Sequence, residues 1–315
     1  MTMTSAYAPF DVSYSQRTPY LTVTEYQNAP TALDIGNLVA GGSPLVQQQA
    51  LQEVIGRASS WMDQFCCGAW GTLAATQNIE NGRVWGNRNG QLVVHPKYWP
   101  ILSVDTFSYS AIGGNQWGVG GLSGGFGTTA ASITPAGNIW IEPQQFVVSP
   151  SGVSSWNVNS AQGIGTAEYF CEWTYTNGWP VTTLAASVAA GSQSITLTNV
   201  TGIFPGTALT LYDMPNDEQI QVASTYSVGA SVVPLVSPLQ YTHFSAMATN
   251  LPPAIKQAAI LATTAFIKER GSGALVVNDI GEVTHSEQGS VQNSAGDWAQ
   301  AEFLLMPFRQ TFVGY

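Results

Sequence analysis

The chain has 315 residues, of which 44% are apolar and only 9% are charged, and its net charge is −10. Its nine Lys and Arg residues are too few for the basic face with which a sequence-independent DNA binder neutralises phosphates, so that class is excluded. The length suffices for two domains, or for one domain with a large insertion. The low charge indicates either a surface that meets other subunits or a neutral extracellular β protein.

The sequence pattern indicates neither a targeting signal nor a disulfide framework. The start "MTMTSAYAPFDVSY" lacks the basic end and apolar segment of a secretory signal, and no apolar run approaches the ~18 residues of a membrane span. The cysteines are Cys66, Cys67 and Cys171. An odd number with an adjacent pair is no disulfide framework, so we expect small buried side chains.

The first predicted elements are an extended arm and two helices. Residues 1–20 are polar and aromatic without periodicity, which indicates an N-terminal arm. Thr22 to Glu25 fits a capping box before a short helix. Ser43 and Pro44 open a helix of roughly six turns that Gly68 ends. Its apolar residues recur in steps of three and four and predict one core-facing stripe: Leu51, Val54, Ile55, Ala58, Trp61, Met62 and Phe65.

From Thr72 the apolar period changes to two, which predicts strands. Asn81-Gly82 and Asn89-Gly90 are typical of two-residue hairpin turns. A glycine-rich stretch near residues 112–131 lacks the Lys-Ser/Thr ending and the βαβ setting of a nucleotide-binding loop, so we interpret it as a flexible loop. Further strands are expected in "NIWIEPQQFVVSP" and "AEYFCEWTYTNGWP".

Residues 181–250 form a different kind of segment. Several short strands with turn signals and no helical period predict a small barrel or sandwich inserted into the rest of the fold. The carboxylates Asp213, Asp217 and Glu218 lack the alternating oxygen ligands of a calcium loop. Because "MPND" is a good turn in its own right, we interpret this cluster as a solvated turn.

A second long helix is predicted from Leu251 to Gly271, with Pro252 and Pro253 in its first turn and Gly271 at its end. Its faces carry small and apolar residues that predict packing against the first long helix: Ile255, Ala259, Ala262 and Phe266. Residues 272–315 are expected to form a C-terminal arm and tail. Residues 272–295 are expected to be a loop or arm, and one or two helical turns around residues 298–305 are expected before an aromatic end.

The sequence therefore predicts an α+β fold. Two long amphipathic helices and β-hairpin or sheet elements form its core, an all-β module is inserted, and both termini are extended arms. The core has a first part at residues 21–180 and a final helix at 251–271, on either side of the module at 181–250.

No catalytic or metal-binding pattern emerges. The histidines His95, His243 and His285 lie in different segments without the clustering of a zinc site, and no serine elbow joins a strand to a helix. A glycosidase pair of Glu142 with Glu168 or Glu172 is disfavoured because carboxylates are sparse. We expect a protein that is not an enzyme and that holds no cofactor or metal.

The order of these elements resembles the head-to-tail connector (adaptor) proteins of tailed bacteriophages. The resemblance rests on "YLTVTEY", the helix "ALQEVIGRASSWMDQFC", the hairpin element "HPKYWPILSV", the strand end "WTYTNGWP" and the helix opening "LPPAIKQAA". It covers residues 20–110, 168–180 and 251–271. The chain departs from the family in the segment 181–250, which separates the strand end from the final helix, and in its long C-terminal region.

The resemblance implies a virion structural protein at the head–tail interface, assembled in the host cytoplasm. Such proteins form a ring, usually a dodecamer, beneath the portal, extend the DNA channel and receive a downstream neck or tail-completion protein. The acidic balance suits a conduit that must not grip passing DNA. By analogy with related adaptors, we expect portal contacts from the C-terminal residues Trp298, Leu304, Leu305, Phe308, Arg309, Phe312 and Tyr315, with docking of this tail on its own subunit as the alternative.

Two other functions remain open at this point. One is another virion structural protein, such as a capsid decoration or tail-associated module that binds through residues 181–250. The other is a glycan-binding or hydrolytic β protein, which the missing signal sequence disfavours.

Overall fold

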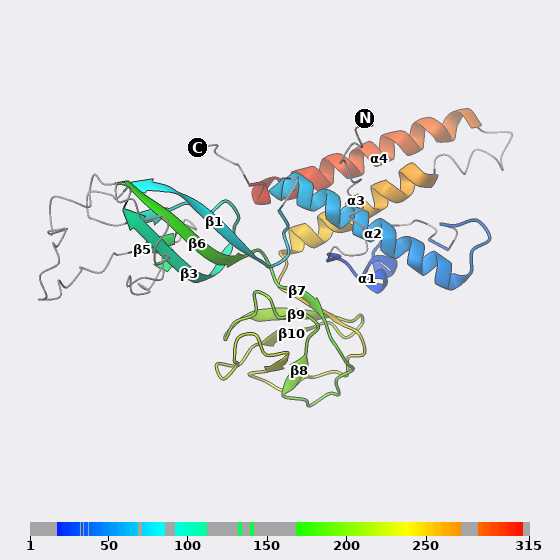
Figure 1. The fold of residues 1–315 in the computed structure, drawn as a ribbon. Helices are drawn as coiled ribbons and strands as arrows, with labels where there is room; N and C mark the ends of the chain where they lie inside the picture. Colours follow the sequence, from blue (N-terminus) through cyan, green and yellow to red (C-terminus); the bar gives the residue numbers. More distant parts are fainter. Residues whose placement is uncertain are drawn as a thin grey trace, which may run out of the picture. The chain divides into compact units, whose positions relative to one another are not determined.

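The computed structural model describes residues 18–31, 33, 35–36, 38–68, 71–85, 92–111, 132–133, 139–141, 168–271 and 283–310. The chain divides into two compact units. Unit 1 combines residues 1–73 with 180–309 and contains the helices and the predicted β module (Figure 1). Unit 2 combines residues 74–179 with 310–315. The predicted α+β class is confirmed, and the chain has a boundary after Leu73 that the sequence did not indicate.

Helices α1 (Val23–Asn28) and α2 (Pro44–Cys67) begin where the capping signals place them. The Thr22 hydroxyl accepts from the Glu25 amide while the Glu25 carboxylate accepts from the Thr22 amide, which is the predicted capping box. Ser43 caps α2, Pro44 follows it, and Gly68 ends the helix with a φ of 73° that favours glycine. The buried stripe of α2 includes Leu51, Val54, Ile55, Ala58 and Met62, whereas Trp61 and Phe65 are half-buried.

Helix α3 (Pro253–Gly271) packs against α2, as expected. Its Ile255, Ala259 and Ala262 are buried and Phe266 is half-buried. Ala258 and Ala265 are buried as well, so small side chains occupy the middle of α3. Small residues let neighbouring helices approach closely, because interaxial distance depends on the side chains at the contact.

The C-terminal region differs from its prediction. Residues Val283–Leu305 form a third long helix, α4, which returns alongside α3 (Figure 1) and ends in the 3₁₀ turn η4 (Met306–Phe308). The loop predicted for residues up to 295 is therefore wrong from residue 283 onward. The first half of α4 is rich in Ser, Gly, Gln and Asn and shows no apolar period, so the sequence pattern gave no sign of a helix.

The β module is a small barrel of six strands, β7 (Val181–Thr183), β8 (Ser194–Thr196), β9 (Ala208–Tyr212), β10 (Glu218–Gln221), β11 (Val232–Pro234) and β12 (Met247–Thr249). One sheet has the order β10-β9-β12-β7 and a second pairs β11 with β8. Bridges Val222↔Leu235 and Leu184↔Leu197 join the two sheets at both sides, so the strands close on themselves around a core of buried Leu, Ile and Val side chains. Its two ends are neighbours, since Val181 pairs with Thr249.

Unit 2 is built on the antiparallel sheet β1-β6-β3, formed by β1 (Thr76–Trp85), β6 (Glu168–Asn177) and β3 (Ile101–Ala111). A second small sheet joins β2 (Leu92–Val94), β5 (Ile139–Ile141) and β4 (Ser132–Ile133). The predicted hairpin turn at Asn81-Gly82 is wrong, because β1 runs straight through it and Gly82 pairs with Cys171. A Cβ at Gly82 would lie 3.5 Å from the Trp173 ring, which is an ordinary contact distance, so the position does not require glycine. Asn89-Gly90 lies outside the described residues.

Candidate functional site

Four groups of residues in unit 1 are chemically distinctive. They are a buried ion pair between α1 and α3, a pocket beside it, a histidine between two carboxylates in the barrel, and the end of α4. Among the described residues no His, Cys, Asp and Glu side chains gather in a group that could hold a metal ion. None of the helices found there is long and apolar enough to span a membrane.

Lys256 of α3 is buried and pairs with Glu25 of α1, with 2.6 Å between Nζ and Oε1. The same ammonium group lies 3.3 Å from the Met247 sulfur and 3.9 Å from the centre of the Tyr212 ring, both in the barrel. Burial lowers the pKa of Lys256, and the Glu25 carboxylate opposes this shift. The Lys256 ammonium group therefore contacts α1 and two strands of the barrel, and so links them to α3.

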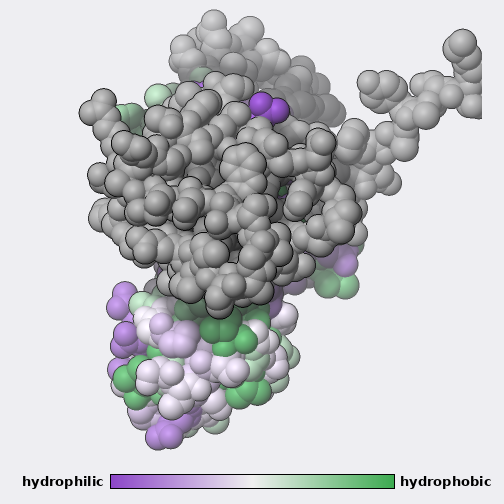
Figure 2. Space-filling model, turned by 60° about the vertical axis from the view of Figure 1, so that its left-hand side comes forward, coloured by the Kyte–Doolittle hydropathy of each residue, from purple (hydrophilic) through white to green (hydrophobic). Residues whose placement is uncertain are grey.

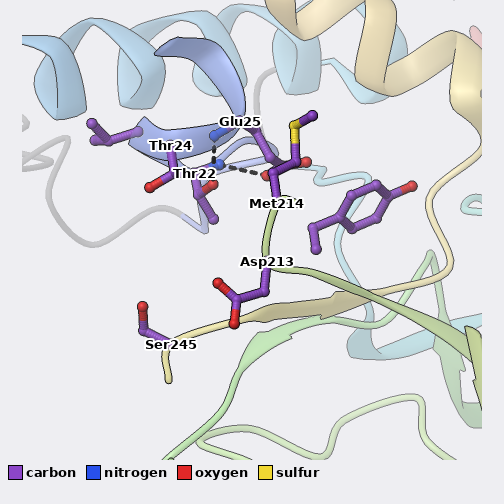
Figure 3. Close-up of a pocket in the computed structure, with 8 residues that line it drawn as sticks. Thr22, Thr24, Glu25, Asp213, Met214 and Ser245 are labelled. Carbon is purple, nitrogen blue, oxygen red and sulfur yellow. Dashed lines mark hydrogen bonds between the residues drawn. The ribbon is translucent and has the colours of Figure 1, made fainter. Parts of the chain in front are cut away.

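A pocket of about 210 Å³ opens next to this ion pair. Its walls come from the start of α1 and from the barrel, and Figure 3 shows Glu25, Met214, Asp213 and Ser245 around it. The lining is polar and comprises Thr22, Val23, Thr24, Glu25, Tyr212, Asp213, Met214 and Ser245. Both Glu25 oxygens are engaged, Oε1 by Lys256 and Oε2 by the Thr22 amide.

The "MPND" segment forms the predicted turn, in which the Asn216 amide donates to the Asp213 carbonyl, but Asp213 and Glu218 are engaged within the barrel and not solvated. Glu218 is buried, and its Oε2 lies 3.2 Å from Nε2 of the fully buried His243. Asp213 Oδ2 lies 3.3 Å from Nδ1 of the same ring. Both ring nitrogens therefore face carboxylate oxygens, and of the three carboxylates only Asp217 remains on the exposed surface. The histidine is 25 residues from Glu218 in the chain, so sequence spacing could not reveal the cluster.

A further buried carboxylate has a structural role. Asp63 of α2 accepts hydrogen bonds from the Tyr20 hydroxyl and from the Leu73 amide. Desolvation raises the pKa of Tyr20 well above its ordinary value, and the Asp63 charge adds to this. Asp63 thus holds the segment before α1 and the segment after α2 against the helical core.

The residues expected to bind a portal differ in how far they are buried. Leu305 is fully buried, and its carbonyl faces the Cys66 thiol at 4.0 Å. Trp298 is half-buried in an aromatic cluster, 4.6 Å from Trp61 and 4.8 Å from Phe266 between ring centres. Its indole nitrogen donates to Glu269 at 2.6 Å. These two side chains are engaged within their own subunit.

Other members of that set are accessible. Arg309 is exposed and lies over the Phe65 ring at 5.4 Å, while Leu304 and Phe308 are half-buried. Phe312 and Tyr315 lie outside the described residues. Phe303 and Met306, which were not among the predicted portal contacts, are 75% and 58% exposed. A helical wheel from residue 298 to 306 would have found them, because they lie opposite the buried Ala301 and Leu305.

The three cysteines are buried and free. Burial raises the pKa of Cys66 to about 12 and of Cys171 to about 12, and it raises the pKa of Cys67 as well. Such thiols are poor nucleophiles, so they behave as the small buried side chains that the sequence analysis expected.

Comparison of the chain with protein-family models, with curated proteins and with solved structures finds no match.

Proposed function

We propose that this chain is a structural subunit of the head-to-tail connector of a tailed bacteriophage. In this proposal it forms a ring, a dodecamer by analogy, beneath the portal at the head–tail interface of the virion. The ring extends the DNA channel, and a downstream neck or tail-completion protein docks on it. DNA passes through without specific binding, in keeping with nine basic residues and a net charge of −10.

The observation that best supports the proposal is the buried pair of Glu25 and Lys256. Glu25 belongs to "YLTVTEY" and Lys256 to "LPPAIKQAA", two of the elements on which the resemblance rests, and they are 231 residues apart. A second bond joins the same helices, since the Tyr26 hydroxyl lies 3.0 Å from the Thr264 hydroxyl. The helical segments that resemble an adaptor core thus meet within unit 1, whereas the hairpin element and the strand end belong to unit 2.

Two exposed apolar surfaces on unit 1 also favour a protein that contacts several partners. At the start of α2, Leu45 is 63% exposed and Val46 is 38% exposed. Near its other end, where Arg309 covers Phe65, the exposed residues are Phe303 and Met306. Twenty residues of helix separate Leu45 from Phe65, a rise of about 30 Å. A subunit between a portal and a downstream protein needs such separated contacts.

Negative-stain electron microscopy of the purified chain, alone and mixed with the portal of the same phage, tests the proposal. We expect closed rings that stack on the portal ring. A monomer that binds polysaccharide would instead support the glycan-binding alternative. A ring with an electropositive lumen would contradict the repulsive conduit while leaving the connector itself in place.

A further inference from the structure

The barrel presents two aromatic side chains to solvent on the short segment from Gln240 to Ser245. Phe244 is 74% exposed and Tyr241 is 43% exposed, and Met214 on a neighbouring turn is 45% exposed. Figure 2 shows hydrophobic residues at the surface of the barrel among weakly polar ones. Large exposed apolar side chains gathered in one place are a feature of interaction sites.

This segment is held in one conformation by buried charge. Glu218 accepts hydrogen bonds from the backbone amides of Gln240 and Tyr241 at 2.8 and 3.2 Å. Asp213 Oδ2 accepts from the amide of Phe244 at 3.2 Å. His243 lies between these two carboxylates, and its own backbone amide and carbonyl pair with Val188. Tyr241 and Phe244 are therefore presented by a fixed backbone, which lowers the entropy lost on binding.

The pocket lies directly beside the aromatic segment. Ser245, the residue after Phe244, is one of its walls, and so are Asp213 and Met214 (Figure 3). Asp213 uses Oδ2 for His243 and Phe244, while Oδ1 has no hydrogen bond among the residues that the structure describes. The partially exposed Asp213 side chain and the hydroxyl groups of Thr24 and Ser245 thus line the pocket, and the exposed Phe244 directly precedes Ser245 in the chain.

The charges of the barrel around the pocket indicate which kind of partner it binds. Residues 181–250 contain Asp213, Asp217 and Glu218 but no Lys or Arg, so every carboxylate of the barrel sequence lies within six positions. Lys256 neutralises Glu25 at the pocket wall. The surface therefore keeps a negative charge that a cationic side chain would complement.

We infer that this end of the barrel docks a protein segment that bears an arginine. The guanidinium group enters the pocket and donates to Asp213 Oδ1 and to the pocket hydroxyls. Its planar face stacks on Phe244, and its aliphatic stem lies along Met214. Arginine fits better than lysine because the guanidinium group has a planar face and several donors, whereas the ammonium group is a compact, strongly hydrated charge.

The test uses the full-length protein and a fluorescein-labelled peptide of alternating glycine and arginine, followed by fluorescence anisotropy at low salt. We expect the arginine peptide to bind more tightly than its lysine counterpart and a glutamate counterpart not to bind. Phe244→Ala keeps the backbone amide that Asp213 holds, so it removes only the ring. It should weaken binding about three- to fivefold, as for an exposed cation–π contact. Val228→Ala, at a residue 57% exposed elsewhere on the barrel, is the matched control and should change nothing.

Two outcomes would overturn the inference. One is no binding of the arginine peptide up to millimolar concentration. The other is equal binding to the wild type, Phe244→Ala and Val228→Ala with complete loss in salt, which indicates unspecific ionic attraction.

His243 acts as a positioning residue. His243→Gln should weaken peptide binding and speed hydrogen exchange at the amides of Tyr241 and Phe244. If His243→Gln unfolds the barrel, peptide binding by the Phe244→Ala variant still tests the inference. The inference does not depend on the connector function, because ring formation and peptide binding are measured separately.

Discussion

Glu25 and Lys256 form an ion pair in which both side chains are about nine-tenths buried and Oε1 lies 2.6 Å from Nζ. The pair joins α1 to α3, and the ring of Tyr212 and the sulfur of Met247 close over the ammonium group from the barrel. A buried ion pair loses much of its Coulombic attraction to desolvation, but removing one partner leaves the other charge buried and uncompensated. A variant that removes one partner should therefore lose more stability than the double variant that removes both.

Replacing only Lys256 with methionine should destabilise the protein by about 3 kcal/mol, because the Glu25 carboxylate then has no cation. Glu25→Gln alone should cost a similar amount, although a glutamine oxygen preserves the capping box. The double variant should recover most of the loss, since no buried charge remains. Urea denaturation of the four proteins measures this, and additive losses in the double variant would contradict coupling between the two residues.

The same pair predicts a dependence on alkaline pH. Burial lowers the pKa of Lys256 in the folded state below the ~10.4 of an unfolded lysine. Between these two values the unfolded chain binds more protons, so this group makes the folded state more stable as pH rises through the window. The stability of the wild type relative to the Lys256→Met, Glu25→Gln double variant should increase as pH approaches ~10.4 from below. A difference that stays constant or shrinks would show that Lys256 is not desolvated.

Removal of the barrel should leave a folded helical core. Val181 pairs with Thr249, and paired residues of neighbouring strands are about 5 Å apart, so a short Gly-Ser linker can replace residues 183–248. The deletion also removes Tyr212 and Met247, which exposes Lys256 to water. Circular dichroism should show the helical signal retained with a lower melting temperature. An unfolded deletion variant would mean that the barrel is part of the core and not an insertion.

The sequence predicted the elements whose signals are local. Thr22 with Glu25, and Ser43 with Pro44, are capping signals that depend on neighbours a few residues apart. The stripe around Leu51 and Met62 depends on helical period alone. These features need no distant partner, so α1, α2, α3 and the presence of short strands in the barrel were expected.

The elements that were missed depend on residues far apart in the chain. Helix α4 lies along α3, a contact that no local pattern encodes. Asn81-Gly82 is a favourable turn in isolation, but pairing along the whole of β6 outweighs it. His243 reaches its carboxylates through the closure of the barrel. In each case contacts between distant parts of the chain, and not the local pattern, decide the structure.

The thiols should be unreactive until the protein unfolds. Cys66, Cys67 and Cys171 are at most 1% exposed, and burial raises their pKa values. At pH 8 an aromatic disulfide reagent should therefore titrate no thiol in the native protein and all three in denaturant. Rapid reaction of one thiol in the native protein would show that its segment opens readily.

Variants at the end of α4 can distinguish residues that stabilise the fold from residues that bind the portal. Phe303 and Met306 are exposed, so the double variant Phe303→Ser, Met306→Ser should change the stability by less than about 0.5 kcal/mol. It should nevertheless reduce binding to the portal, which size-exclusion chromatography of the mixture measures.

Trp298→Ala removes a ring that contacts Trp61 and Phe266, so it should lower the stability by about 2 kcal/mol whether or not a partner is present. Leu45→Ser, at the opposite end of α2, is the matched exposed control and should leave portal binding unchanged. If the double variant bound the portal as tightly as the wild type, the end of α4 would be ordinary surface, and the portal contact would lie elsewhere on the subunit.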